Sequence, residues 1–291
     1  MTIPHMSTAD DSPHTRRSLS AAASVLREGT GERVELSSFL DEELAVLLQE
    51  TGLPGPAIWM PWEEQNPGGV EAGAASVARI LRRRRHLVPE ALAAELEDRE
   101  PEIAEEALVT DPTTAGTLVL RRSAVAVTTA RRTISVSGEP RELRCYFYHQ
   151  SVGVTLEEKV TAEGLHSFAV LPTAEVGERL TMLVDPQGVA SSDSEMREIP
   201  AGTPPEEWGE GIAEGTRHLT QVVTASADSA TARSAAFHAT DAAVHVAVAD
   251  SVTAAPDGST ALRIAQAGPE SLQDVLDQIV GGGDTAPTDP A

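Results

Sequence analysis

Histidine is the residue type in this chain best suited to bind a metal ion or to move a proton near neutral pH. The sequence has eight histidines, and His149, His166, His238 and His245 each stand alone in a different apolar segment. Zinc hydrolases instead place two histidines at His-Glu-x-x-His or a similar spacing on one helix. A metal site here would need separate segments to converge, and we expect none.

The sequence patterns of nucleophilic catalysis are also absent. There is no Gly-x-Ser-x-Gly turn, no Ser-x-x-Lys pair and no glycine-rich phosphate loop after a predicted strand. The pair Glu157 and Glu158 has the character of ordinary solvated charge, without an apolar pocket to raise a carboxyl pKa. The single cysteine, Cys145, lies in an apolar run and predicts a buried, inert thiol. We therefore expect no enzyme activity and no cofactor.

The run Arg82-Arg83-Arg84-Arg85 is the densest cationic segment of the chain. It ends one predicted helix and precedes another, so a DNA-binding regulatory protein is the alternative hypothesis. The second helix, from Glu90 to Glu102, is acidic where a recognition helix should be neutral or basic. Cations also stabilise the C-terminal end of a helix through the helix dipole. We favour a solvated helix end and expect no nucleic-acid partner.

Charge and hydropathy narrow the class of protein further. The formal net charge is −23, which disfavours binding to phosphate backbones and to anionic membrane surfaces. No apolar run approaches the roughly 18 residues that span a bilayer. The stretch from Ser20 to Leu26 is too short and too weakly apolar for a secretory signal. We expect a soluble, cytoplasmic protein without membrane insertion.

Tryptophan offers the clearest candidates for contact with a partner. Only 3% of the residues are aromatic, and tryptophan is enriched at protein interfaces. In an aromatic-poor chain the same side chains also serve to fill a core. The sequence leaves open whether Trp59, Trp62 and Trp208 are core or interface residues.

The elements that must position these residues repeat along the sequence. In each of two stretches, a series of alternating strands leads into a short amphipathic helix with the same spacing of apolar residues. The helix positions are Val176, Leu180, Leu183 and Val184 in the first stretch and Leu272, Leu276, Ile279 and Val280 in the second. The repeat predicts an α+β fold, a quasi-two-fold body of antiparallel sheet with flanking helical bundles.

Composition shifts set the expected domain boundaries. Polar sequence without periodicity predicts disordered tails at both ends and a linker between two α+β halves. The expected segments are an N-terminal tail at 1–33, an N-terminal half at 34–185, a linker at 186–204, a C-terminal half at 205–280 and a C-terminal tail at 281–291. Within the halves we expect a helix from Phe39, a strand at 117–120 and a helix near Pro205 that carries Trp208 and Ile212.

The order of elements resembles the EspG family, cytosolic chaperones of type VII (ESX) secretion in actinobacteria. The similarity spans roughly residues 34 to 280 and includes the repeated meander-plus-helix unit. Its motifs are Phe39-Leu40-Asp41-Glu42-Glu43-Leu44 running to Gly52-Leu53-Pro54, and the helix ending Leu81-Arg82-Arg83-Arg84-Arg85-His86-Leu87. His86 stands where the family more often has glycine.

The resemblance implies a non-enzymatic chaperone or adaptor. Family members bind the hydrophobic tip of helical PE/PPE-like substrates and keep them soluble, and masking an apolar patch in a groove is the physical basis. The family contacts come from sheet loops and a C-terminal helical bundle, which points to the loop 128–141 and the predicted helix near Pro205. The expected partner-binding residues are Trp208, Ile212 and Arg132. Neither the substrate's identity nor the oligomeric state follows from the sequence.

Overall fold

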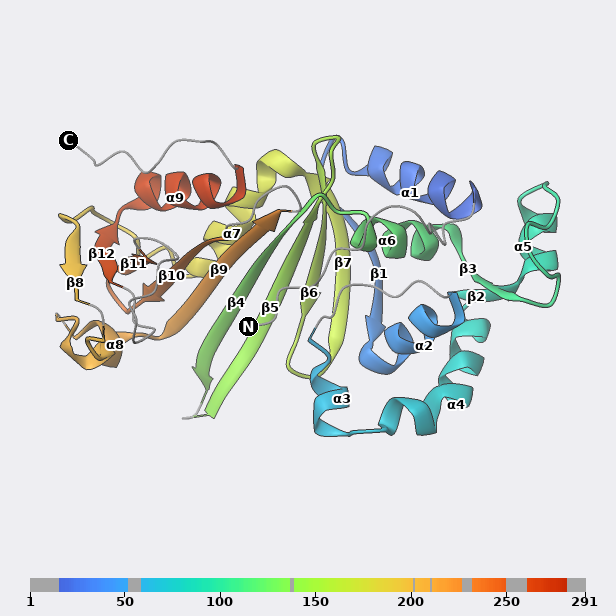
Figure 1. Ribbon diagram of the computed structural model, residues 1–291, viewed down its shortest axis with the longest axis horizontal. Coiled ribbons are helices and arrows are strands. Elements are labelled where there is room, and N and C mark those ends of the chain that lie inside the picture. Colours follow the sequence, from blue (N-terminus) through green and yellow to red (C-terminus); the bar gives the residue numbers. More distant parts are fainter. Residues whose placement is uncertain are drawn as a thin grey trace. The chain divides into compact units, whose positions relative to one another are not determined.

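The computed structural model describes residues 16–51, 59–136, 139–200, 202–209, 211–226, 232–249 and 261–281. Helices and antiparallel strands confirm the predicted α+β class (Figure 1). The chain forms two compact units. Unit 1 comprises Met1–Ala126 and Arg144–Thr173, and unit 2 comprises Val127–Leu143 and Ala174–Ala291.

Unit 1 contains strands in the order β1-β7-β6-β5 and a separate pair, β2 and β3. Its elements are α1 (Arg16–Glu28), β1 (Val34–Leu40), α2 (Asp41–Thr51), α3 (Pro61–Gln65), α4 (Gly69–Arg83), β2 (Leu87–Pro89), α5 (Glu90–Leu96), β3 (Leu108–Thr110), α6 (Pro112–Arg122), β6 (Val154–Val160) and β7 (Leu165–Pro172). Strand β5 (Glu139–His149) begins in unit 2 and ends in unit 1.

One face of the unit 1 sheet forms the core of that unit. Tyr148, Leu156 and Val170 align across β5, β6 and β7 and are buried. Helices α1 and α6 lie over this face, because α1 contacts β7 and α6 contacts β6. Phe147, Glu157 and Ala169 align on the opposite face and are buried as well, so these strands are covered on both sides.

Helix α1 corrects the sequence prediction of a disordered tail at 1–33. Arg16–Glu28 is helical, and Ala21, Ala22 and Val25 are buried. The helix packs closely on α6, where a methyl group added at Gly116 would lie 2.7 Å from the carbonyl oxygen of Ala21. Small residues therefore allow two backbones to approach here. Residues 1–15 lie outside the described residues.

Unit 2 contains strands in the order β4-β9-β10-β11-β12-β8. Its elements are β4 (Ala126–Val136), α7 (Val176–Val184), β8 (Arg197–Ile199), the 3-10 turn η2 (Pro205–Glu207), α8 (Ile212–Gly215), β9 (His218–Ser226), β10 (Arg233–Ala239), β11 (Val244–Ala249), β12 (Leu262–Ala267) and α9 (Pro269–Gly281). A further 3-10 turn, η1 (Thr173–Glu175), precedes α7.

Unit 2 buries both faces of its sheet against different elements (Figure 1). Val222 of β9 and Phe237 of β10 lie on one face, under α7 and α9. These helices contact each other, and the Thr181 hydroxyl donates to the Gln273 side-chain oxygen at 2.8 Å. The opposite face packs against the segment that contains α8. The two faces thus have different coverings.

The repeated order of elements predicted from the sequence is present. Strands β4 to β7 precede α7, and strands β9 to β12 precede α9. Strand β4 is continuous over Ala126–Val136. The predicted linker at 186–204 contains β8, which pairs with β12. The predicted halves 34–185 and 205–280 follow the repeat along the chain and stay a prediction, and residues 282–291 lie outside the described residues.

Three local predictions were wrong. Residues 117–120 belong to α6, which is buried along nearly its whole length, so its apolar residues show no helical period. The signals that indicate the start of this helix are Pro112 and the N-cap residue Asp111. Phe39 is a strand residue of β1, and α2 begins at Asp41. The expected helix near Pro205 is only the turn η2 and the four-residue α8.

The contact of α1 with α6 generates a stability prediction. Gly116→Ala should lower the free energy of unfolding by about 1–3 kcal/mol, because the new methyl group meets the α1 backbone. Gly73→Ala, in helix α4 with open space around it, should instead gain about 0.5–1 kcal/mol. Urea unfolding of both variants measures the difference. A gain at Gly116 would show that α1 does not pack there.

Candidate partner-binding surface

Unit 2 carries a surface groove of about 630 Å³. One wall is formed by residues 194–198, which lead into and include most of β8. The other contributions come from Ile212 of α8, His245 of β11 and residues 264–266 of β12. The strand β8 ends the strand order of this unit among the described residues. An edge strand leaves backbone groups free to pair with an incoming segment.

The floor of the groove is a small apolar cluster. Ile199, Ile212, Ala247 and Ile264 are buried together, and Trp208 packs against them half-buried. Ile212 is only 2% exposed, so its side chain belongs to the core of unit 2. The cluster holds α8 on the face of the sheet opposite α7 and α9, beside the edge strand β8.

Trp208 is positioned by polar contacts as well as by packing. Its indole Nε1 donates to the carbonyl oxygen of Thr203 at 3.1 Å, and its ring meets that of His238 edge-on with 5.3 Å between the centroids. Arg197 donates to the Trp208 carbonyl oxygen. The local chain is therefore fixed without a regular helix, and the indole keeps part of its surface accessible.

Met196 gives the groove an exposed apolar side chain. It is 41% exposed and lies between the charged and polar neighbours Glu195 and Arg197. An exposed, flexible thioether flanked by charges suits contact with apolar side chains of a protein partner. Sequence analysis did not select Met196, because a lone methionine in a polar segment carries no periodic signal.

The structure does not bring Arg132 together with Trp208 and Ile212. Arg132 of β4 lies 3.3 Å from the His218 ring nitrogen on β9. His218 pairs with Ala239, one residue beyond His238 on β10, and successive strand residues point to opposite faces. Trp208 contacts His238, so Arg132 lies on the α7 and α9 face. Burial and the Arg132 charge lower the pKa of His218. The tip of the 128–141 hairpin, residues 137–138, lies outside the described residues.

Trp59 and Trp62 have partners within unit 1. The Arg144 guanidinium lies 4.6 Å from the centre of the Trp59 ring, and the Trp59 indole donates to Glu64 at 3.2 Å. Trp62 packs over Gly69, where an added methyl group would be 2.6 Å from the ring. Both side chains are half-buried. They are thus engaged inside the unit, as Trp208 is in unit 2.

A buried ionic network ties the helices of unit 1 to its sheet. His166 of β7 lies between two carboxylates, with Nε2 at 2.7 Å from Asp41 and Nδ1 at 2.7 Å from Glu158. Arg121 of α6 donates to Glu158 at 2.9 Å, and the Tyr148 hydroxyl donates to it at 2.7 Å. Side chains from α2, α6, β5, β6 and β7 therefore meet in one cluster.

The charge states in this network follow from its geometry. A carboxylate at each ring nitrogen requires both nitrogens to donate, so His166 is an imidazolium. Burial lowers the pKa of His166, but the hydrogen bonds that the ring donates to Asp41 and Glu158 outweigh burial and hold the pKa above its ordinary value. Burial raises the pKa of Glu158, and Arg121 and His166 reverse this and lower it. The positive charges of Arg121 and His166 then balance the negative charges of Asp41 and Glu158.

The network is suited to structure and not to catalysis. Asp41, Glu158 and His166 are fully buried, and Arg121 is 1% exposed, so no substrate reaches them. The sequence prediction of solvated charge at Glu157 and Glu158 was wrong, because Glu157 is also buried and is bound by Arg33 at 2.9 Å. Three of the seven residues of β6 are charged, so the strand's own composition does not indicate that its glutamates are buried.

Among the described residues, no group of three His, Cys, Asp or Glu side chains is placed to hold a metal ion. No helix within the described ranges is both long and apolar enough to span a bilayer. Burial lowers the pKa of His149 to about 4, which makes its ring neutral at physiological pH.

The different burial of Ile212 and Met196 leads to a first prediction for this surface. Ile212→Ala should lower the free energy of unfolding by about 2–5 kcal/mol, because it removes a buried side chain from the cluster under the groove. Met196→Ala should change it by less than about 0.5 kcal/mol, because the side chain is exposed. Denaturant unfolding of the two variants tests this. Equal, small effects would mean that the cluster is not packed.

The buried imidazolium leads to a pH prediction. A raised pKa contributes stability that is complete below the unfolded value of about 6.5 and is lost as pH rises through the folded pKa of His166. His166→Gln should therefore lose about 3–5 kcal/mol near pH 6, and its deficit relative to the unmodified chain should shrink at higher pH. Unfolding curves between pH 5 and roughly pH 9 measure it. A deficit that is independent of pH would mean a neutral ring.

No family model matches the sequence, and no curated protein matches it. Among solved structures, the fold is similar to that of EspG5, the type VII secretion system chaperone of Mycobacterium tuberculosis, in its complex with a PE25-PPE41 dimer. The two chains are 9% identical with a TM-score of 0.49, and the match covers 89% of this chain and 98% of the other. A likeness of this size carries no argument about function.

Proposed function

We propose that this chain is a non-enzymatic, cytoplasmic chaperone or adaptor that binds and shields the hydrophobic tip of helical, PE/PPE-like substrates of type VII secretion. The sequence resemblance to the EspG family, over residues 34 to 280, is the source of the substrate class. The groove of unit 2 is the observation that carries the proposal, since it joins an exposed apolar side chain to an edge strand, above an apolar cluster against which the half-buried Trp208 packs.

Binding at this groove is a matter of covering apolar surface. Met196 and the accessible part of Trp208 offer contact area to apolar side chains at the end of a helical substrate. Arg197 and Glu198 are exposed at the rim of the groove, where charged groups contribute more to specificity than to affinity. Trp208 stays a predicted contact, whereas Ile212 supports the floor from below.

The proposal that the chain is not an enzyme rests on how its ionisable groups are used. The most deeply buried charged residues are bonded to one another at 2.7–2.9 Å. A catalytic acid or base must reach a substrate atom at hydrogen-bonding distance. Charged groups that are bonded to one another and closed to solvent serve the fold instead.

DNA binding is the second candidate function, because Arg82, Arg83 and Arg85 are exposed. Arg84 is bound by Glu43 at 2.6 Å, which leaves three cations on one helix end in a chain of net charge −23. Affinity for duplex DNA grows with the number of phosphates neutralised. We therefore favour the chaperone, and duplex binding that weakens steeply with salt would favour the alternative.

Co-expression with a helical PE/PPE-like protein pair tests the chaperone directly. The unmodified chain should raise the soluble yield of the pair and co-purify with it, because it covers the apolar tip that drives aggregation. Met196→Asp places a charge in the groove and should abolish co-purification, and Trp208→Ala should reduce it by roughly tenfold or more in affinity.

Met182→Asp is the matched control for this experiment. Met182 is 46% exposed on α7, which covers the opposite face of the sheet, so this variant should retain the partner. Circular dichroism and unfolding curves confirm that each variant is folded. Unchanged co-purification with Met196→Asp and Trp208→Ala would refute the assignment of the groove, and no gain in soluble yield from the unmodified chain would refute the function.

A further inference from the structure

Unit 1 carries a second apolar groove, of about 310 Å³, beside the arginine-rich end of α4. Its apolar lining comes from β2 and α5, and Arg82 and Arg85 complete it. The apolar residues are Leu87, Val88, Pro89, Leu92 and Leu96. This site lies in a different unit from the groove proposed for the secretion substrate, and its role does not depend on that function.

Helix α5 presents an unpartnered apolar stripe at this groove. Leu92 and Leu96 are one helical turn apart and are 43% and 72% exposed. Ala93 and Ala94, on the other side of the same helix, are buried. Exposed single leucines are ordinary, but two at positions i and i+4 that also line a groove form a surface suited to a partner helix.

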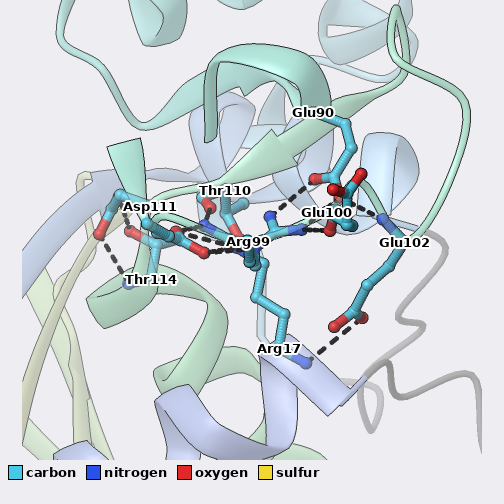
Figure 2. Close-up of polar contacts among 9 residues, drawn as sticks. Arg17, Glu90, Arg99, Glu100, Glu102, Thr110, Asp111 and Thr114 are labelled. Carbon is cyan, nitrogen blue, oxygen red and sulfur yellow. Dashed lines mark hydrogen bonds and ion pairs between the residues drawn. The ribbon is translucent and has the colours of Figure 1, made fainter. Parts of the chain in front are cut away.

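The orientation of α5 is fixed from its buried side. Figure 2 shows the Arg99 guanidinium directed at Glu90, which it binds at 2.6 and 3.0 Å, while Arg17 of α1 lies beside Glu102. Hydrogen bonds from Arg99 lower the pKa of Glu90, which is 1% exposed. Arg17 also donates to Glu97 at 2.7 Å. The leucine stripe is therefore held outward and cannot simply turn inward to be buried.

The rim of the groove is cationic. Neither the Arg82 nor the Arg85 side chain has a hydrogen bond or ion pair within the described part of the chain, and both are exposed. Arg85 has a positive φ of 64°, which ends α4 and turns the chain into β2. A chain with 45 acidic and 22 basic residues thus leaves two unpaired cations beside its exposed leucines.

We propose that this groove docks an amphipathic helix of a partner protein that carries carboxylates beside its leucine-like residues. Apolar side chains of that helix would pack against Leu92 and Leu96, and its carboxylates would pair with Arg82 and Arg85. Nucleic acid fits less well, because a phosphate backbone would leave the leucines uncovered. A second copy of this acidic chain would need to bring acidic residues to the same two arginines.

Two labelled peptides distinguish these occupants by fluorescence anisotropy. One is an amphipathic helix with leucines at i, i+4, i+7 and i+11 and glutamates between them, and the other has lysines in place of the glutamates. The glutamate peptide should bind roughly tenfold more tightly, because opposite charges meet at the rim. Arg82→Glu with Arg85→Glu should reverse this preference, and Leu92→Ser with Leu96→Ser should weaken both peptides by roughly tenfold.

Matched controls separate the groove from general effects of charge and hydropathy. Arg83→Glu changes an exposed arginine that does not line the groove, and Val152→Ser changes an apolar residue that is 63% exposed in a turn. Both should leave the glutamate peptide within about twofold of its original affinity. Equal binding of the two peptides, or equal loss with the controls, would overturn the proposal. The proposal would also be overturned if the unmodified chain associated with itself, or bound duplex DNA, and only the groove variants removed that binding.

Discussion

The imidazolium of His166 between Asp41 and Glu158 is the interaction on which unit 1 depends. Two hydrogen bonds of 2.7 Å and the Arg121 ion pair balance the charge in a space closed to solvent. Removing one member would leave a buried charge without compensation, which is far more costly than losing an exposed ion pair. The Asp41 carboxylate also accepts the Trp62 backbone amide at 2.7 Å. The start of α3 is thereby tied to the same cluster.

In unit 2, the two faces of the sheet carry different elements and have different roles. Alternation along β9 and β10 sends Val222 and Phe237 towards α7 and α9, and sends His238 towards Trp208. A partner at the proposed groove beside β8 would therefore contact the face that carries α8. Arg132 supports His218 on the other face, so it contributes to the packing of the sheet and not to that groove.

The strand repeat could be predicted from the sequence because alternation and turn residues are local signals, and a series of strands was expected before both α7 and α9 on that basis. Helix α6 was missed because residues buried on every side of a helix lose its period. The pairing of His166 with Asp41 joins residues 125 positions apart, and nothing local indicates it. Of the predicted partner-binding residues, Trp208 and Ile212 lie together in the structure. Arg132 lies on the other face of the sheet, and this placement depends on the register of the strands.

We propose that a helical partner docks on the α8 face of unit 2. Hydrogen exchange of the purified chain, alone and with a bound PE/PPE-like pair, measures which amides the partner covers. The account predicts slower exchange at residues 195–199 and 262–267, with little change along α7 and α9. Protection confined to α7 and α9, or no protection in unit 2 on formation of a complex, would contradict it.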